Sequence, residues 1–308
     1  MSETSTIHDH ADLPRRWGAE DRIGAGNLLT PATRLAALSL VETGDVVDLG
    51  HVIADGAPRI PPDQTPYVMS LTTRAQSVVR NLDAHNVKNR FGANLERIEM
   101  TTHVGTHIDA LGHVSVGERM YNGLATDDVV GDYGLKQLGV ENVPPIITRG
   151  VLLDVAGLDG ADMLEAGRAV TLDDIQRARD TAGVDIREGD VVCIHTGWGA
   201  LFMKDNSRYV RGEPGIDVEA AEWLTAQGVV AIAADNMAVE VMPNPRHPEL
   251  IMPVHQHTLV DNGVYLIENL KLDELATLGR GPNEFCFVLL STKLKGATGC
   301  PVRPVALF

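Results

Sequence analysis

Cysteine is scarce in this sequence, which has Cys193, Cys286 and Cys300 among its 308 residues. The three lie far apart and form no C-x-x-C pair. This spacing argues against a disulfide framework and against a cysteine zinc site, and it is typical of proteins from a reducing cytoplasm. Cys193 and Cys286 lie in apolar stretches, so we interpret them as packing residues.

Long apolar runs and an excess of basic charge are lacking as well. No apolar run approaches the length that a membrane-spanning helix needs. Residues 1–12 lack the basic and apolar regions of a signal peptide, and we expect them to form a mobile tail. Lys and Arg number 26 against 42 Asp and Glu, so the net charge is −16. We therefore expect a cytoplasmic protein without nucleic-acid or membrane partners.

The motifs of two common enzyme classes are also missing. No G-x-S-x-G is present, which disfavours a serine hydrolase. Gly24-Ala25-Gly26 and Gly197-Trp198-Gly199 lack the third glycine of a dinucleotide-binding loop, which disfavours an NAD enzyme. His195 ends an apolar run, and we interpret it as structural rather than catalytic.

Three segments carry the signals of helix ends. In each, a capping residue precedes the helix and a glycine follows it. Thr171 to Asp174 also resembles a capping box, with aspartate in the acidic place. The expected helices begin after Thr30, Thr171 and Asp217, and they end before Gly44, near Gly183 and at Gly228.

β-branched or apolar runs between these helices are predicted to form strands. The run at 229–234 shows no polar alternation, which predicts a strand covered on both faces. Sheets flanked by helices follow, so we expect residues 13–308 to form a single α/β domain. The runs lie at about 46–53, 66–72, 95–102, 150–155, 190–195, 229–234, 264–267 and 284–291.

The segment 103–113 holds three histidines and an aspartate, which are ligand types that suit Zn²⁺, Mn²⁺ or Fe²⁺. An extended chain, rising about 3.3 Å per residue, would hold the end histidines about 33 Å apart. A continuous helix would point Asp109 away from His103. The side chains can therefore converge only if the backbone folds back, and Gly105 and Gly112 permit this.

We expect the backbone to turn at Val104-Gly105-Thr106, with Thr106 bracing the turn. His107 and Asp109 then lie as neighbours on a short extended piece. The alternative is a histidine-rich surface loop, or core histidines satisfied by hydrogen bonds. Four such groups around a glycine turn favour a metal site over that alternative.

A second candidate half-site lies far downstream. Glu268 ends an apolar run, where a charge is costly unless it is paired or bound to a metal. The alternative is a carboxylate at a strand end that faces water. His255 and His257 precede the run and could be site residues or polar loop residues. Hydrolytic metal sites commonly draw ligands from distant segments, so the pairing with residues 103–113 is plausible.

The motif H-x-G-T-H-x-D-x-x-x-H at 103–113 resembles the signature of the cyclase family of metal-dependent hydrolases, which includes bacterial kynurenine formamidase and isatin hydrolase. The resemblance covers roughly residues 15–308 and is greatest to the longer branch of the family. It implies a swivelling β/β/α domain with mixed sheets flanked by helices, and a homodimer or homotetramer. Further matching segments include Gly24-Ala25-Gly26-Asn27, Tyr121-Asn122-Gly123, Gly189-Asp190-Val191-Val192, Ala234-Asp235-Asn236 and Gly296-Ala297-Thr298-Gly299.

The resemblance also implies roles for individual residues. The interval from His255 to Glu268 is one residue longer than in the formamidases, so Gln256 and His257 are alternatives to His255. Isatin hydrolase holds a single manganese with the first three ligands, so we expect one or two ions of Mn or Zn. The implied metal ligands are His103, His107, Asp109, His113, His255 and Glu268, and His113 and Glu268 are also the catalytic candidates.

The resemblance predicts that the protein hydrolyses a small amide, cyclic amide or lactone, as isatin hydrolase does, with a metal-activated water. His113 would act as general base and then as acid, and Glu268 would ligate the metal or orient a histidine. Leu111 replaces a proline that is common in the formamidases, and residues 51–58 lack their aromatic side chain. Arylformamidase activity on N-formylkynurenine-type substrates is therefore an alternative. A non-catalytic metal-binding protein of the same fold is another.

Overall fold

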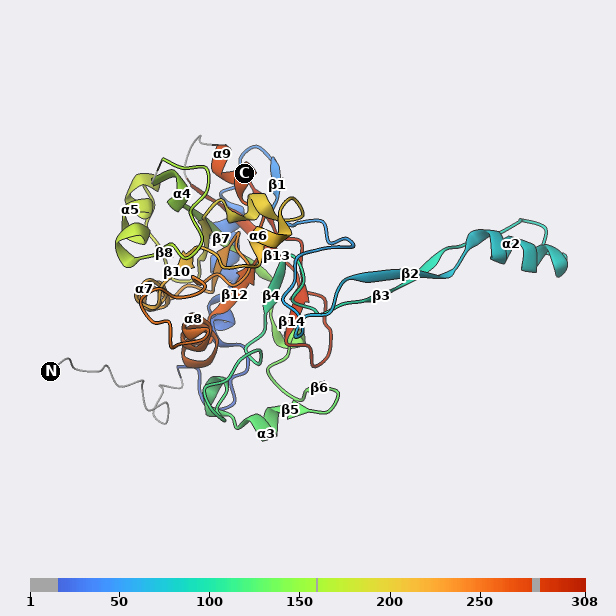
Figure 1. Ribbon diagram of the computed structural model, residues 1–308, viewed down its shortest axis with the longest axis horizontal. Coiled ribbons are helices and arrows are strands. Elements are labelled where there is room, and N and C mark those ends of the chain that lie inside the picture. Colours follow the sequence, from blue (N-terminus) through green and yellow to red (C-terminus); the bar gives the residue numbers. More distant parts are fainter. Residues whose placement is uncertain (1–15, 159, 279–282) are drawn as a thin grey trace.

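A nine-stranded mixed sheet forms the centre of the molecule within the residues that the structure describes (Figure 1). The structure is a computed structural model, and it describes residues 16–158, 160–278 and 283–308. The predicted mobile tail, residues 1–12, lies outside the described residues. The strand order is β1-β15-β13-β7-β9-β11-β12-β4-β14.

Four neighbouring strands in the middle of this sheet run parallel. Every residue of β9, β11 and β12 is buried, which confirms the strand expected from the unbroken aliphatic run at 229–234. The carboxyl ends of parallel strands meet at one edge, where ligands commonly bind. The four strands are β7 (Ile146–Asp154), β9 (Val191–His195), β11 (Ala231–Ala234) and β12 (Tyr265–Glu268).

Antiparallel strands flank this parallel centre on both sides. β4 (His107–Asp109) pairs with β12, and β14 (Gly299–Pro301) pairs with β4. On the far side, β13 (Glu284–Leu289) pairs with β7, and β15 (Val305–Leu307) lies between β13 and β1 (Val46–Asp48). The predicted strand at 46–53 is thus shorter than expected, and β14 and β15 were not predicted. Small two-stranded sheets are formed by β5 (Val130–Gly131) with β6 (Gly134–Leu135), and by β8 (Ala169–Val170) with β10 (Gly215–Ile216).

The three predicted helices are present. α5 (Leu172–Ala182) begins with the expected capping box and ends at left-handed Gly183, and α7 (Val218–Ala226) is capped by Asp217. α1 (Pro31–Leu38) starts as predicted but ends well before Gly44. The reason is tertiary, because the backbone N–H groups of Thr43 and Gly44 donate to the Phe308 carbonyl beside β15.

Shorter helical segments complete the described part of the body. Among the helices that the structure describes, none has the length and apolar character to cross a membrane. The α-helical segments are α3 (Thr126–Val129), α4 (Val155–Leu158), α6 (Asn206–Tyr209), α8 (Pro253–His255) and α9 (Asp273–Thr277). The 3₁₀ turns are Gly24–Leu28, Tyr121–Gly123, Val140–Asn142 and Trp198–Leu201, and a π-helical turn spans Gln256–Asn262.

A long arm projects from the body (Figure 1). It consists of β2 (Val68–Thr73), α2 (Ala75–Ala84) and β3 (Leu95–Glu99), with β2 and β3 paired antiparallel. Every residue from 65 to 102 is exposed or half-buried. The sequence predicted both strands, but it did not predict α2 or the separation of this hairpin from the central sheet.

Candidate metal centre

The segment 103–113 folds as predicted, with a turn followed by a short strand. Gly105 has a φ of +75°, and a Cβ there would lie 2.6 Å from the Ile53 side chain, so only glycine fits. The chain then enters β4, where His107 is opposite Glu268 of β12. Thr106 braces the turn as expected, because its hydroxyl donates to the Asn269 carbonyl and accepts from the His51 N–H.

The fold brings all six predicted ligands together, and Asp109 lies between them. Its Oδ1 is 3.0 Å from His103 Nδ1 and 3.4 Å from His107 Nε2. Its Oδ2 is 3.6 Å from His255 Nε2 and 3.9 Å from His113 Nε2. We call these residues the six-residue cluster: His103, His107, Asp109, His113, His255 and Glu268.

Glu268 closes the cluster from the neighbouring strand. Its Oε2 is 3.2 Å from His107 Nε2, and its Oε1 is 3.1 Å from His255 Nε2. Two groups of three side chains have ligand atoms that all lie within 4.8 Å of one another, and both include Asp109. One group is His103, Asp109 and His113, and the other is His107, Asp109 and Glu268.

Hydrogen bonds outside the cluster orient its imidazole rings. His107 Nδ1 donates to the Gly105 carbonyl at 2.8 Å, which turns Nε2 toward the carboxylates. His255 Nδ1 donates to Glu240 Oε1 at 2.6 Å, so its Nε2 also faces the cluster. His103 Nε2 lies 2.9 Å from the Thr298 hydroxyl. Such outer contacts fix the tautomer and direction of ligating histidines.

Glu240 is the residue of this centre that the sequence analysis missed. It is buried, and its carboxylate also accepts from the backbone N–H groups of Val254 and His255. The signal was available, because Glu240 stands between Val239 and Val241 as a lone charge in an apolar stretch. The same argument had identified Glu268.

The buried polar atoms of this centre fit a cation. Asp109 is fully buried, and neither of its carboxylate oxygens has a hydrogen-bond partner of acceptable geometry among the described residues. The same holds for His107 Nε2. Buried unpaired carboxylates are strongly unfavourable, whereas carboxylate and imidazole together form a common ligand set for divalent metals.

The ionisable groups of this centre shift one another's pKa values. Burial lowers the pKa of His107, but the nearby Glu268 and Asp109 carboxylates outweigh it and raise that pKa to about 10. Burial lowers the pKa of His113 to about 4, although Asp109 opposes this. A metal ion must displace the proton of His107 in order to bind, so metal affinity should fall as the pH decreases.

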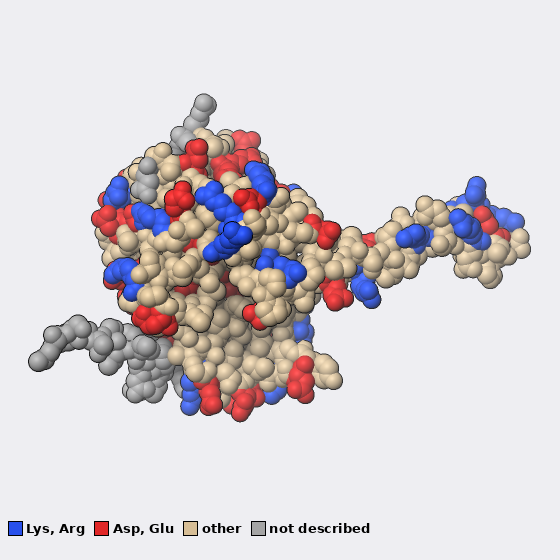
Figure 2. Space-filling view, in the orientation of Figure 1, with Lys and Arg blue, Asp and Glu red and all other residues tan. Residues whose placement is uncertain are grey.

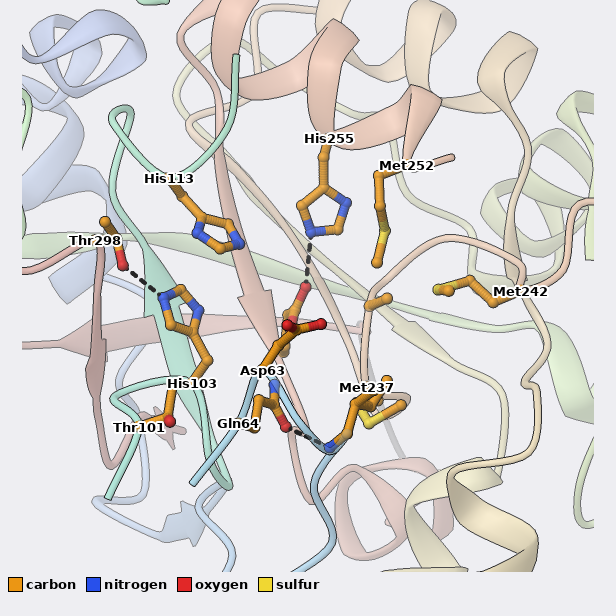
Figure 3. A pocket seen from close by; sticks show the side chains of 13 residues that line it. Asp63, Gln64, Thr101, His103, His113, Met237, Met242, Met252, His255 and Thr298 are labelled. Carbon is orange, nitrogen blue, oxygen red and sulfur yellow. Dashed lines mark hydrogen bonds and ion pairs between the residues drawn. The ribbon is translucent and has the colours of Figure 1, made fainter. Parts of the chain in front are cut away.

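The cluster opens into a cavity of about 510 Å³ (Figure 3). His103, His113 and His255 point into it from one side, and Met237, Met242 and Met252 lie on the other. Of the cluster, His113 has the most exposed side chain, at 30%. The remaining lining residues are Ile60, Asp63, Gln64, Thr101, Ala238, Glu268 and Thr298.

The two alternatives to His255 point elsewhere. The Gln256 amide donates to the Ser115 carbonyl, and His257 Nε2 lies 2.8 Å from the Thr225 hydroxyl of α7. His195 lies at the end of β9, where its Nδ1 is 2.7 Å from Asp154. Among the described residues, His195 is not one of those that line the cavity.

Comparisons with known proteins give a consistent result. A family model described as "Putative cyclase" matches residues 47–241. A solved structure described as a novel cyclase is 30% identical, covers 95% of this chain and 98% of its own, and has a TM-score of 0.84. Among curated proteins, none matches the sequence.

Two more distant structures share the fold. Isatin hydrolase A from Ralstonia solanacearum is 20% identical, with 90% of this chain and 97% of that chain covered and a TM-score of 0.64. A predicted metal-dependent hydrolase from Bacillus stearothermophilus is also 20% identical, with 86% and 98% covered and a TM-score of 0.53. The predicted mixed α/β fold is thereby confirmed.

Proposed function

The chain belongs to the cyclase family, and from this membership we propose that it is a metal-dependent hydrolase that cleaves a small amide, cyclic amide or lactone. The observation that carries the proposal is the environment of Asp109. Its buried carboxylate has ring nitrogens of four histidines within 3.9 Å and has no hydrogen-bond partner of acceptable geometry among the described residues. The distant relatives described as isatin hydrolases and as a metal-dependent hydrolase support the same reaction class.

The six-residue cluster would hold one or two divalent ions, which we propose to be Mn or Zn. His107, Asp109 and Glu268 form one possible ligand group, and His103, Asp109 and His113 form the other. Such an ion supplies positive charge that polarises a substrate carbonyl and makes water more acidic. The Asp109 carboxylate belongs to both groups, so it would be a ligand in either case.

His113 is the general base and acid of this proposal. It is the cluster member most open to the cavity, so it is the one that a substrate can reach. If the one ion is held by His107, Asp109 and Glu268, the His113 ring is left free to take a proton from the attacking water and return it to the leaving nitrogen or oxygen. The His103 ring stacks against the His113 ring with centroids 4.1 Å apart, and this contact restricts how far the base can rotate.

The cavity wall opposite the histidines suggests what the substrate carries. Met237, Met242 and Met252 line that wall, and Ile60 and Ala238 are further apolar residues of the cavity lining (Figure 3). Thioether side chains are apolar and adapt to irregular shapes, and they make favourable contacts with aromatic rings. A cavity of about 510 Å³ is of the size that holds a small organic molecule. We therefore propose that an apolar group, such as an aromatic ring, adjoins the scissile carbonyl.

A hydrolysis screen tests this proposal. The protein is purified without chelator, its metal is measured by mass spectrometry, and acid release is followed with aryl lactones, cyclic amides, anilides and N-formyl anilides. We expect bound metal and turnover of an aryl lactone or cyclic amide, with slower turnover of alkyl analogues of the same ring. Turnover of the N-formyl anilides alone would reassign the protein as an arylformamidase. Bound metal without turnover across the panel would support a non-catalytic protein.

A further inference from the structure

Glu213 is a buried carboxyl group that lies outside the six-residue cluster. Acidic side chains are spread over the surface of the body (Figure 2), whereas Glu213 is only 1% exposed. Its Oε1 has no hydrogen-bond partner among the described residues. A buried carboxyl group with an unpaired oxygen costs free energy. A role that offsets this cost is indicated by the contacts of the other oxygen and of the Glu213 backbone.

These contacts lead to the cavity wall opposite the histidines. Glu213 Oε2 accepts a hydrogen bond from the Met237 N–H at 2.8 Å. The Glu213 backbone is joined to Met242 by two hydrogen bonds, of 2.7 Å and 3.1 Å. Met237 and Met242 both line that wall (Figure 3). Glu213 thus holds both ends of the stretch from Met237 to Met242, which we call the methionine segment.

Two glycines beside Glu213 permit this close contact. A Cβ at Gly215 would lie 2.3 Å from the carbonyl carbon of Glu240, and a Cβ at Gly212 would lie 2.9 Å from the carbonyl oxygen of Met242. Neither position has room for a side chain without a shift of the backbone it faces. The sequence Gly212-Glu213-Pro214-Gly215 therefore allows the chain to lie directly against the methionine segment.

The methionine segment has a strained backbone that needs such support. Val239, near its middle, has a φ of +60°, a conformation that β-branched residues rarely adopt. Val239 is fully buried, and its carbonyl accepts a hydrogen bond from the Ile216 N–H at 3.1 Å. Residues in such conformations persist only where the surrounding structure fixes them, and they are frequent at functional sites. Here the contacts with residues 213–216 fix the segment.

We propose that Glu213 is a positioning residue that sets the shape of the cavity wall opposite the histidines and thereby determines which substrates the cavity prefers. It acts through Met237 and Met242, since Glu213 itself is not among the described residues that line the cavity. The inference rests on the proposed function, which places the apolar group of the substrate against this wall.

Metal binding should depend on Glu213 much less than substrate binding does. Glu240 lies in the methionine segment and orients His255, but it is also held from outside the segment. Its carboxylate accepts hydrogen bonds from the N–H groups of Val254 and His255. Loss of the Glu213 carboxyl group therefore leaves Glu240 with its own anchors and leaves the wall without one of its own.

The test compares three variants of the full chain, loaded with Mn²⁺, on dihydrocoumarin as an aryl lactone and δ-valerolactone as an alkyl lactone. Glu213→Leu removes the hydrogen-bond acceptor, and Glu213→Gln keeps one. Asp174→Leu is the matched control, because it removes a buried carboxylate that caps α5 and does not line the cavity.

We expect Glu213→Leu to raise the KM for dihydrocoumarin about tenfold, while kcat and metal content change by less than about twofold. The KM for δ-valerolactone should change less, because the smaller alkyl ring makes fewer contacts with the wall. Glu213→Gln and Asp174→Leu should both keep the KM of the wild type for dihydrocoumarin.

The methionine methyl groups give a readout that needs no hydrolysis. In protein labelled with [methyl-¹³C]methionine, Glu213→Leu should shift or broaden the signals of Met237 and Met242 and leave that of Met69 on the arm unchanged. Glu213→Gln should leave all three signals in place. The wild type provides a further measurement if Glu213→Leu does not fold, because the Met237 N–H should be protected from hydrogen exchange.

Several results would overturn the inference. They are an unchanged KM for dihydrocoumarin in Glu213→Leu, an equal rise in Asp174→Leu, unchanged Met237 and Met242 signals in Glu213→Leu, and an unprotected Met237 N–H in the wild type. Failure of the wild type to hydrolyse either lactone would count against the proposed function instead. In that case the methyl signals and the hydrogen exchange alone decide whether Glu213 holds the wall.

Discussion

At the scale of single residues, the chemistry of the centre depends on side chains that touch no substrate as well as on those that do. Glu240 is such a residue, since it accepts a 2.6 Å hydrogen bond from His255 Nδ1 and lies outside the cluster itself. Without that bond, the His255 ring can adopt the other tautomer and turn its nitrogen away from Glu268. Glu240 is therefore a positioning residue.

Replacing Glu240 by Gln is expected to weaken metal binding about 10- to 100-fold, because the neutral amide holds the His255 N–H less strongly. Competition with a metal-sensitive chelator dye measures the affinity. His257→Gln is the matched control, since His257 faces Thr225 instead, and it should leave the affinity unchanged. Equal affinities for wild type and Glu240→Gln would contradict the role of Glu240.

His113→Ala separates catalysis from ligation. If His113 is the base, the variant keeps its metal and its turnover falls by about 10²- to 10⁴-fold. Metal content and turnover are measured on the same preparation. Gln256→Ala is the control, since the Gln256 amide donates to the Ser115 carbonyl and not to a member of the cluster. Unchanged turnover would remove His113 from the mechanism, and loss of the metal would make it a ligand.

At the scale of secondary-structure elements, the sequence predicted those features whose physical cause lies within a few residues along the chain. The caps at Thr171 and Asp217 fixed two helix starts, because an N-cap side chain acts on backbone within its own turn. The turn at Gly105 was predictable for the same reason. The π-helical turn Gln256–Asn262 was not, although it follows His255 directly and lies within the long interval to Glu268. Such turns are rare and depend on tertiary contacts.

The capping box of α5 gives a prediction about acid stability. Asp174 is desolvated, but Arg168 and Thr171 lower its pKa to about 2. A folded-state pKa below the usual value of 3.8 means that this carboxylate stabilises the fold above that pH. The stabilisation is lost as the pH falls from about 4 toward 2.

Asp174→Asn should therefore lower the free energy of unfolding by about 1 kcal/mol at pH 7 and by less near pH 2. Urea unfolding at several pH values measures this. Asp173→Asn in the same helix turn is the control, because the Asp173 side chain is 79% exposed. A difference between the two variants that stays constant from pH 7 to pH 2 would contradict the assignment.

At the scale of the whole molecule, the site is made where the parallel part of the sheet meets its antiparallel edge. The pairing of β12 with β4 sets Glu268 opposite His107, and β14 brings Gly299 against the His103 ring. A Cβ at Gly299 would lie 2.6 Å from His103 Cε1. These pairings join segments far apart in the chain. Sequence patterns could therefore identify the candidate site residues but could not show which of them are in contact.

The arm marks a second limit of sequence patterns. Its apolar residues predicted ordinary strands at 66–72 and 95–102, because a pattern shows that a face will be covered and not which chain covers it. Within one copy of the chain that face is exposed.

Asp109 and its histidines are proposed to hold a metal that the reaction requires. The most direct test is to strip the protein with chelator and follow hydrolysis of the best substrate while Mn²⁺ or Zn²⁺ is titrated back, alongside Asp109→Asn. We predict that activity rises in proportion to bound metal, saturates at one or two ions per chain, and stays at least about 100-fold lower in Asp109→Asn at every metal concentration. Full activity after the metal is stripped, or in Asp109→Asn, would show that the reaction does not require a metal held by Asp109.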